Sequence, residues 1–160
     1  MVNFLNILAE LKAFAESDEV LDIFLISVNQ TKAEVTNRIH NSEKGSKSIT
    51  GKSLKSPFKS KSSPYASSYA EYRKSIGRQT KVIDLELTSS LRKSLETIRA
   101  AESIKMGYLS RAEFEKILKL EKHFGEAIFG LSNDEEKDIK KNISKAINTR
   151  IEEIINGKNN

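Results

Sequence analysis

The residues that come nearest to a chemical signature are Gly45, Gly51 and Lys52, which resemble a phosphate-binding P-loop. In a P-loop, four residues separate the two glycines, so that successive backbone N–H groups wrap the phosphates. Here five residues separate them, no strand-like run precedes the first glycine, and no helical pattern follows the lysine. The spacing therefore argues against a nucleotide site.

The other titratable candidates are two histidines and one pair of carboxylates. His40 and His123 lie at the ends of expected helices, where a cap or surface role explains each better than a role as base or metal ligand. Asp84 and Glu86 alternate along an expected strand and would share its solvent face. With no histidine or third acid nearby in sequence, we interpret them as exposed strand charges. The chain also has no cysteine, which excludes a disulfide, a thiolate metal site and a thiolate nucleophile. Since no metalloprotease, serine-hydrolase or acidic metal-loop motif occurs either, we expect a protein that is not an enzyme and needs no cofactor or metal.

Charge is unevenly distributed along the 160 residues, which carry a net charge of +5. Residues 41–81 hold ten basic and two acidic residues, a net +8, which leaves −3 for the remainder. A basic insert on a slightly acidic body indicates an anionic partner, either DNA or an acidic neighbouring subunit, or else a solubilising loop. The candidate partner-facing or DNA-facing side chains are six lysines: Lys44, Lys47, Lys52, Lys55, Lys59 and Lys61.

These lysines belong to a serine- and lysine-rich segment, residues 41–63, which we call the basic loop. It has few large apolar side chains, so alone it cannot bury enough surface to offset the entropy of ordering. We expect an extended arm, which could span about 70 Å at about 3.3 Å per residue. Before it, residues 1–40 are expected to form two helices, 3–15 and 17–40, with a weak point near Thr31.

After the basic loop, residues 64–131 are expected to hold a helix and a small sheet. The helix would begin at Pro64 and end at Gly77. Residues 82–88 alternate like a half-buried strand, and residues 94–100 and 104–109 form an antiparallel pair. A helix over 111–123 follows. Residues 132–157 form the last helix, which opens with a capping box of Ser132 and Glu135.

Two apolar stripes could form subunit interfaces. In the last helix, isoleucines recur every four residues, and its final turns exceed what one small domain needs. Tyr65, Tyr69 and Tyr72 fall on one helical face beside basic residues, which indicates core or interface more than stacking on nucleic acid bases. The candidate subunit interface comprises Tyr65, Tyr69, Ile147, Ile151, Ile154 and Ile155. The chain as a whole is expected to be a single α+β domain: a small antiparallel sheet flanked by N-terminal helices and a long amphipathic C-terminal helix, with an extended basic arm.

Three short segments follow one another in a recognisable order. After Gly51, the first contains Pro64-Tyr65, Tyr69-Ala70, Lys74 and Gly77. The second contains Val82, Asp84, Leu85 and Thr88, and the third contains Ile128, Phe129, Gly130, Leu131 and Glu135. Together they resemble the tail-completion, or virion-morphogenesis, family of tailed-bacteriophage proteins over about half of the chain. Ser89 stands where that family usually has glycine, Ile83 is an insertion, and the basic loop is unusually basic.

The resemblance implies architecture and assembly, with Asp84, Leu85, Thr88, Ile128, Phe129, Gly130 and Leu131 as structural positions. Family members are small α+β domains that form closed rings around the DNA channel, between portal-side connector proteins and the tail tube. The chain is thus expected to be a virion protein of the neck or tail, assembled in the host cytoplasm. Its partners would be other copies of itself, connector and tail-tube proteins, and genomic DNA through non-specific contacts.

Two alternatives are weighed beside this hypothesis. A basic nucleic-acid-binding accessory protein would explain the charge of the basic loop. An enzyme of unrecognised type has no residue to nominate. The longest apolar runs are too short and too polar to cross a bilayer, and the N-terminus lacks the basic region of a signal peptide, so no membrane association is expected.

Overall fold

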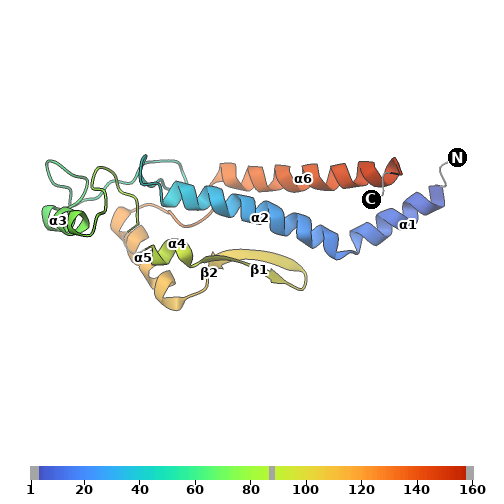
Figure 1. The fold of residues 1–160 in the computed structure, drawn as a ribbon, viewed down its shortest axis with the longest axis horizontal. Coiled ribbons are helices and arrows are strands. Elements are labelled where there is room, and N and C mark those ends of the chain that lie inside the picture. Colours follow the sequence, from blue (N-terminus) through green and yellow to red (C-terminus); the bar gives the residue numbers. More distant parts are fainter. Residues whose placement is uncertain (1–3, 87–88, 158–160) are drawn as a thin grey trace.

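Two long helices, α2 (Asp18–Ile39) and α6 (Asn133–Ile155), run side by side along the molecule (Figure 1). A computed structural model describes residues 4–86 and 89–157 of the chain. Arg38 near the end of α2 bonds Glu135 near the start of α6, and Glu19 at the start of α2 pairs with Arg150 near the end of α6. The two helices are therefore antiparallel.

Local chemistry explains where α6 begins and why α2 continues unbroken. Ser132 accepts a hydrogen bond from the Glu135 N–H, and the Glu135 carboxylate accepts one from the Ser132 N–H, so the predicted capping box of α6 is confirmed. In α2, the hydroxyls of Ser27 and Thr31 donate to carbonyls one turn earlier, at 2.9 and 3.2 Å. These bonds satisfy both buried hydroxyls, and α2 passes through Thr31 without a break.

One β-hairpin packs on the face of α2 away from α6. Its strands are β1 (Leu95–Ala100) and β2 (Ser103–Tyr108), paired antiparallel from Leu95 opposite Tyr108 to Ala100 opposite Ser103. The predicted hairpin is thus confirmed. It is preceded by the single-turn helix α4 (Ser90–Lys93) and followed by α5 (Arg111–Phe124), which ends at Gly125 in the left-handed conformation, φ +66°.

The two ends of the elongated molecule differ. At one end, α1 (Phe4–Ala15) continues past the paired helices; at the other lie α3 (Ser67–Ser75), α5 and the basic loop (Figure 1). α3 begins three residues after the predicted start, because Tyr65 lies outside it with a buried side chain and its N–H bonded to the Ser63 hydroxyl. Within the described residues there are six helices and one two-stranded antiparallel sheet, the α+β class predicted from sequence.

The strand predicted over residues 82–88 is wrong for the residues that can be compared. Residues 82–86 form no strand, and Leu85 has a φ of +48°, far from extended geometry. Asp84 and Glu86, expected on a solvent face, are both buried. The alternation of apolar and acidic residues is therefore not that of a strand: Asp84 pairs with Arg73, and Glu86 pairs with Arg92. Thr88 lies outside the described residues.

The basic loop is a loop, as predicted, but it is packed on the body instead of extending from it. Ser46, Ser48 and Leu54 are buried, and Lys47 forms an isolated antiparallel bridge with Ser53. The Ser46 hydroxyl donates to the Ile39 carbonyl at the end of α2. The Ile49 N–H donates to the Ala127 carbonyl at 2.9 Å. Hydrogen bonds to the rest of the chain, and the burial of Leu54, thus stabilise an ordered conformation of the basic loop, which its composition alone did not predict.

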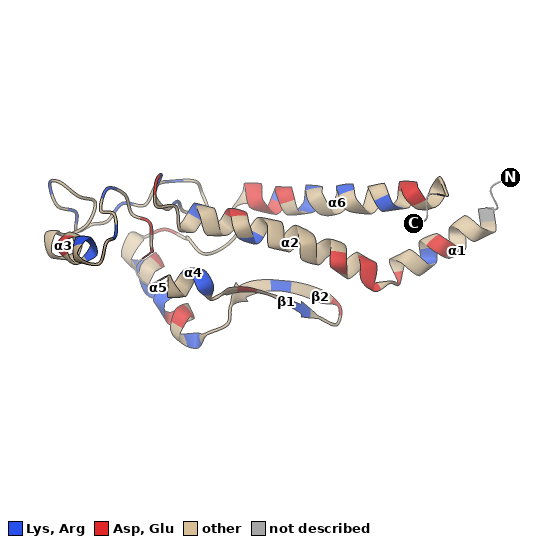
Figure 2. Ribbon diagram, viewed as in Figure 1, with Lys and Arg blue, Asp and Glu red and all other residues tan. Residues whose placement is uncertain are grey.

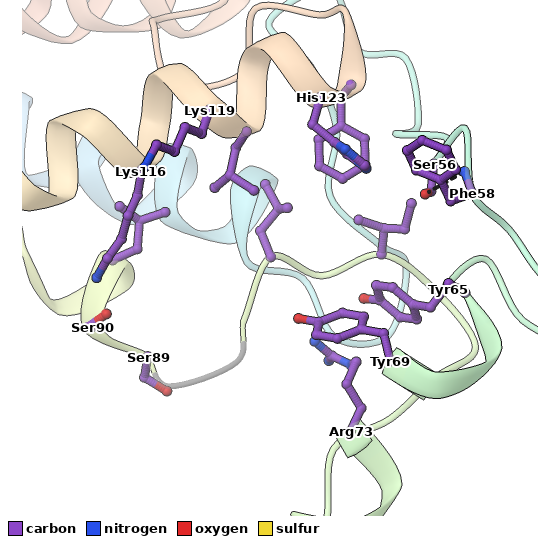
Figure 3. Close-up of a pocket in the computed structure, with 16 residues that line it drawn as sticks. Ser56, Phe58, Tyr65, Tyr69, Arg73, Ser89, Ser90, Lys116, Lys119 and His123 are labelled. Carbon is purple, nitrogen blue, oxygen red and sulfur yellow. Dashed lines mark hydrogen bonds between the residues drawn. The ribbon is translucent and has the colours of Figure 1, made fainter. Parts of the chain in front are cut away.

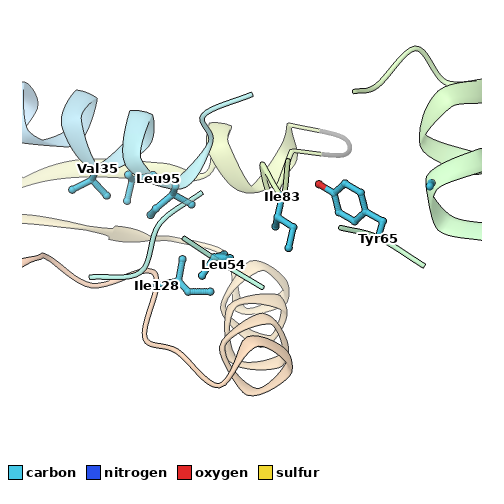
Figure 4. Packing of buried hydrophobic residues seen from close by; sticks show 8 residues of the cluster. Val35, Leu54, Tyr65, Ile83, Leu95 and Ile128 are labelled. Atoms are coloured by element: carbon cyan, nitrogen blue, oxygen red, sulfur yellow. The ribbon is translucent and has the colours of Figure 1, made fainter. Parts of the chain in front are cut away.

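A buried apolar cluster joins α2, the basic loop, α3 and β1 (Figure 4). α2 contributes two side chains, the basic loop contributes Leu54, and β1 contributes Leu95; the rest come from the segments around α3 and before α6. The members are Val35, Ile39, Leu54, Tyr65, Ala70, Ile83, Leu95 and Ile128. The core therefore lies between α2 and the end of the molecule that carries α3 and α5, and it fixes the position of that end.

Candidate functional site

A groove of about 650 Å³ opens at this end of the molecule, between α3 and α5 (Figure 3). We call it the α3–α5 groove. Tyr65 and Tyr69 line one side, and side chains of α5, among them Leu120 and Phe124, line the other. Its volume is that of pockets which bury a small molecule or several side chains of a partner protein. No sequence motif pointed to it, because its walls come from four separate segments.

Apolar side chains form most of the groove, and cations stand at its edge. Ile83 and Leu85 contribute from the irregular segment before α4, and Leu91 contributes from α4. Lys116, Lys119 and His123 lie along α5, as Figure 3 shows. Lys116 pairs with Glu113 at 2.7 Å, and the exposed ring of Phe58 stacks on His123 with centroids 5.9 Å apart. The groove therefore suits a ligand or partner that has an apolar surface and negatively charged groups beside it.

A buried ion pair holds the α3 side of the groove in place. One guanidinium nitrogen of Arg73, Nη2, bonds both carboxylate oxygens of Asp84, at 2.8 and 2.9 Å. Gln79 donates to the same carboxylate at 2.6 Å. Because Arg73 lies on α3 and Asp84 lies in the irregular segment that also supplies Ile83 and Leu85, the pair fixes two walls relative to each other.

Tyr65 connects this ion pair to the groove. Its hydroxyl donates to the Val82 carbonyl at 3.0 Å and accepts from the Asp84 N–H at 3.2 Å. The Arg73 guanidinium lies 4.7 Å from the centroid of its ring, in cation–π geometry. Burial, and secondarily the negative charge of Asp84, raises the pKa of the Tyr65 phenol to about 12. The side chain is therefore a neutral, fixed wall.

The structure separates the predicted interface residues into three groups by burial. Tyr65 and Ile154 are buried inside the chain, at 7% and 4% exposure, and so do not offer a surface to another subunit. Ile147 and Ile151 are half-buried on α6, and only Tyr69 and Ile155 are exposed. The last turns of α6 pack near Phe14 of α1, so most of the isoleucine stripe serves the fold of the single chain.

All six lysines of the basic loop point away from the core. Lys44, Lys47, Lys52, Lys55, Lys59 and Lys61 are exposed. Lys52 forms a long ion pair with Glu126, 3.6 Å apart, which crosses to the segment before α6. The packed loop thus presents a basic surface, while Leu54 faces the core and Phe58 remains exposed.

The predicted structural segment before α6 is a hydrogen-bonded joint. Ile128 is fully buried, Phe129 and Leu131 pack against the core, and Gly130 lies on the surface. Glu121 of α5 accepts from the N–H groups of Ile128 and Phe129, at 2.7 and 3.0 Å. Arg38 of α2 donates to the carbonyls of Ile128 and Gly130, at 2.8 and 2.7 Å. The joint therefore ties α2, α5 and α6 together.

Sequence reasoning missed Arg38, Arg73 and Glu121. Each is a charged residue on an amphipathic helix, and the hydrogen-bond partners of its side chain lie 6 to 97 residues away. No spacing rule links such partners, so periodicity alone could not have found them. Glu135 is a partial exception, because its capping box was recognised. Burial raises the pKa of the Glu135 carboxyl, but its bonds to Arg38 and Ser132 outweigh that effect and lower it overall.

The two histidines lie where helix ends were expected. His40 follows α2 directly and is buried, while His123 lies in the last turn of α5 and is exposed. Among residues 4–86 and 89–157, no three His, Cys, Asp or Glu side chains are grouped so as to hold a metal ion. No helix in that part of the chain has both the length and the apolar character needed to cross a membrane. No protein-family model, no curated protein and no solved structure matches the chain.

Proposed function

We propose that the chain is a structural subunit that assembles with copies of itself into a ring in the neck or tail of a tailed bacteriophage. The observation that carries the assembly role is its large exposed surface. The chain exposes 10820 Å², whereas a compact monomer of its mass exposes about 8,050 Å² by the scaling ~6.3 M^0.73. A chain this extended leaves surface that neighbouring subunits can cover.

Exposed apolar side chains lie on α1 and on α5, toward the two ends of the molecule. Leu8 is 47% exposed on α1, and Phe114 and Leu118, one turn apart on α5, are 53% and 51% exposed. Apolar side chains grouped in this way are typical of protein interfaces. Different surfaces at the two ends fit a head-to-tail contact, which closes into a ring when the rotation per subunit allows it.

The assignment to phage particles depends on the resemblance of the three sequence segments. One structural detail supports it. Ser89 stands where the family usually has glycine, and its φ of +61° lies in the left-handed region that glycine adopts without steric cost. The third segment forms the joint around Arg38, which agrees with the structural role that the resemblance implies for Ile128 and Gly130.

In this proposal the partners are a portal-side connector protein on one face of the ring and the tail tube on the other. The exposed lysines of the basic loop contact an acidic neighbouring subunit. Lysines lining a channel through which the genome slides would have to avoid tight phosphate binding. The ring would be part of the virion, built in the host cytoplasm. No catalytic step is assigned.

Two measurements test the proposed function. Sedimentation of the purified full-length chain over a wide concentration range should show a discrete oligomer, and negative-stain images should show closed rings. Mass spectrometry of purified tailed particles should find the chain at a fixed low copy number. A chain absent from the particles, or one that turns over a small-molecule substrate, would contradict the proposal.

A second candidate function is a nucleic-acid-binding accessory protein, favoured by the exposure of all six lysines of the basic loop. It predicts that the isolated chain binds duplex DNA with an affinity that falls steeply as salt rises. Replacing the six lysines by glutamine should then abolish DNA binding. DNA affinity that stays weak at low salt argues against this candidate and leaves the assembly role unaffected.

A further inference from the structure

The exposed face of α1 needs a covering surface. Leu11 is half-buried and Phe14 is buried, where the helix meets α6 and α2, but Leu8 on the adjacent face is 47% exposed and Leu5 is 72% exposed. Because these two leucines are three residues apart, they lie on the same side of the helix. An amphipathic helix with such a face is the kind of element that docks in an apolar groove.

The α3–α5 groove provides such a surface, but at the opposite end of the molecule (Figure 1). Its rim carries exposed aromatic rings, including Phe58 at 69% and Tyr69 at 38% exposure. Aromatic side chains of this kind often dominate the energy of protein interfaces. Since α1 and the groove lie at opposite ends, α1 of a chain cannot fill its own groove.

The two ends of the molecule also carry opposite net charges (Figure 2). Residues 4–22, which form α1 and the start of α2, contain five acidic residues and one lysine, a net charge of −4. The other end carries the net +8 of residues 41–81 together with Lys116 and Lys119 at the groove. The acidic end of one copy is therefore complementary to the basic end of the next.

We propose that α1 of one copy docks into the α3–α5 groove of the next copy, with Leu5 and Leu8 inserted between the tyrosines and α5. Glu16, which follows the last turn of α1, then lies near Lys116, Lys119 and the lysines of the basic loop. This inference rests on the proposed assembly function and deepens it, because it names the contact that builds the oligomer. The contact joins different surfaces, so repeating it produces a ring or a filament.

Disulfide trapping tests the contact directly, because the chain has no cysteine of its own. Two full-length single variants, Leu8→Cys on α1 and Lys119→Cys at the groove, are mixed and oxidised mildly. The matched control replaces Leu8→Cys by Asn6→Cys, an exposed position on the opposite side of α1. We expect a reducible dimer from the Leu8 and Lys119 mixture, several-fold more abundant than from the control mixture. A chain that carries both cysteines should form longer cross-linked species.

A charge substitution supplies a second, independent readout. Leu8→Glu should weaken self-association by about tenfold or more, because it places a carboxylate in the apolar groove. Asn6→Glu, which adds the same charge on the far side of α1, should leave self-association within about threefold of the parent. Thermal unfolding at low concentration should be similar for all three chains, since Leu8 is exposed in the single chain. Raising the salt concentration should weaken association of the parent.

The outcomes separate this contact from the proposed function. Ring formation without preferential Leu8–Lys119 cross-linking overturns the docking of α1 and leaves the ring proposal standing. If the chain stays monomeric and gives no cross-link, the docking of α1 is overturned. The ring proposal is then decided by whether the chain is present in purified particles. If native mass spectrometry instead finds a small apolar molecule that stays bound both to the parent and to the Leu8→Glu and Asn6→Glu variants, that result overturns the second copy as the occupant of the groove.

Discussion

The Arg73 guanidinium and the Asp84 carboxylate form a buried ion pair, with bonds of 2.8 and 2.9 Å and side chains only 1% and 3% exposed. The pair joins α3 to the irregular segment before α4, and both of these line the groove. Gln79 and Tyr65 complete the hydrogen bonding of the carboxylate and its backbone. Such a pair contributes more to a unique geometry than to net stability, because burying both charges costs about as much as their attraction returns.

Removing one partner of this pair should strongly destabilise the fold. Arg73→Met leaves the Asp84 carboxylate buried without its cation, so we expect the free energy of unfolding to fall by about 3–5 kcal/mol. Chemical denaturation followed by circular dichroism measures the loss. The double variant Arg73→Met with Asp84→Leu should recover part of it, since no buried charge remains. A loss below about 1 kcal/mol, the range of exposed ion pairs, would show that the pair is not buried in solution.

The positions of Asp84 and Glu86 show where sequence patterns stop being informative. Alternation of apolar and charged residues normally indicates a strand with one solvent face. In this segment Leu85 adopts a positive φ, and the carboxylates turn inward to Arg73 and Arg92. The capping box of α6, the β-hairpin and the limits of α2 were predictable because neighbours in sequence determine them. The groove was not, because distant charged partners set its walls.

Burial of His40 predicts a loss of stability in mild acid. Burial lowers the pKa of His40 below its usual 6.5, and the nearby Glu86 only partly opposes this effect. A group whose pKa is lower in the folded state stabilises the fold above its unfolded pKa, and this contribution is lost as the pH falls below about 6.5. The melting temperature should therefore decline between about pH 7.5 and about pH 5.5.

The variant His40→Leu should flatten this pH dependence, because it removes the group that must stay neutral in the fold. Differential scanning calorimetry over the same pH range measures the slope for each chain. His123→Leu is the matched control, since its side chain is exposed and its removal should leave the slope unchanged. Identical slopes in the parent and in His40→Leu would assign the acid sensitivity to other groups.

The left-handed backbone at Ser89 should be a measurable source of strain. Its φ is +61°, and its hydroxyl donates to Glu86 at 3.0 Å. Ser89→Ala and Ser89→Gly both lose that hydrogen bond, but only glycine also relieves the steric cost of the left-handed conformation. We expect Ser89→Gly to be more stable than Ser89→Ala by about 1 kcal/mol, as determined by chemical denaturation. Equal stability of the two variants would show that the conformation is not strained.

The basic loop shows how composition can mislead about order. Its serines and lysines predicted an arm free of the body, since loops of such composition bury little apolar surface. What sequence could not reveal is that two of these serines, Ser46 and Ser48, are buried, and that Leu54 joins the core. The lysines alone behave as expected from their type, because all six remain exposed.

The last prediction separates the structural part of the basic loop from its charged surface. Leu54→Ala should lower the free energy of unfolding by about 2–4 kcal/mol, because it leaves a cavity in the core cluster. Replacing all six lysines by glutamine should change stability by less than about 1 kcal/mol, since their side chains are exposed, yet it should weaken self-association and abolish its salt dependence. Chemical denaturation and sedimentation measure the two effects. If Leu54→Ala is as stable as the parent, the loop is the free arm that composition indicates, and the core of this chain is smaller than described.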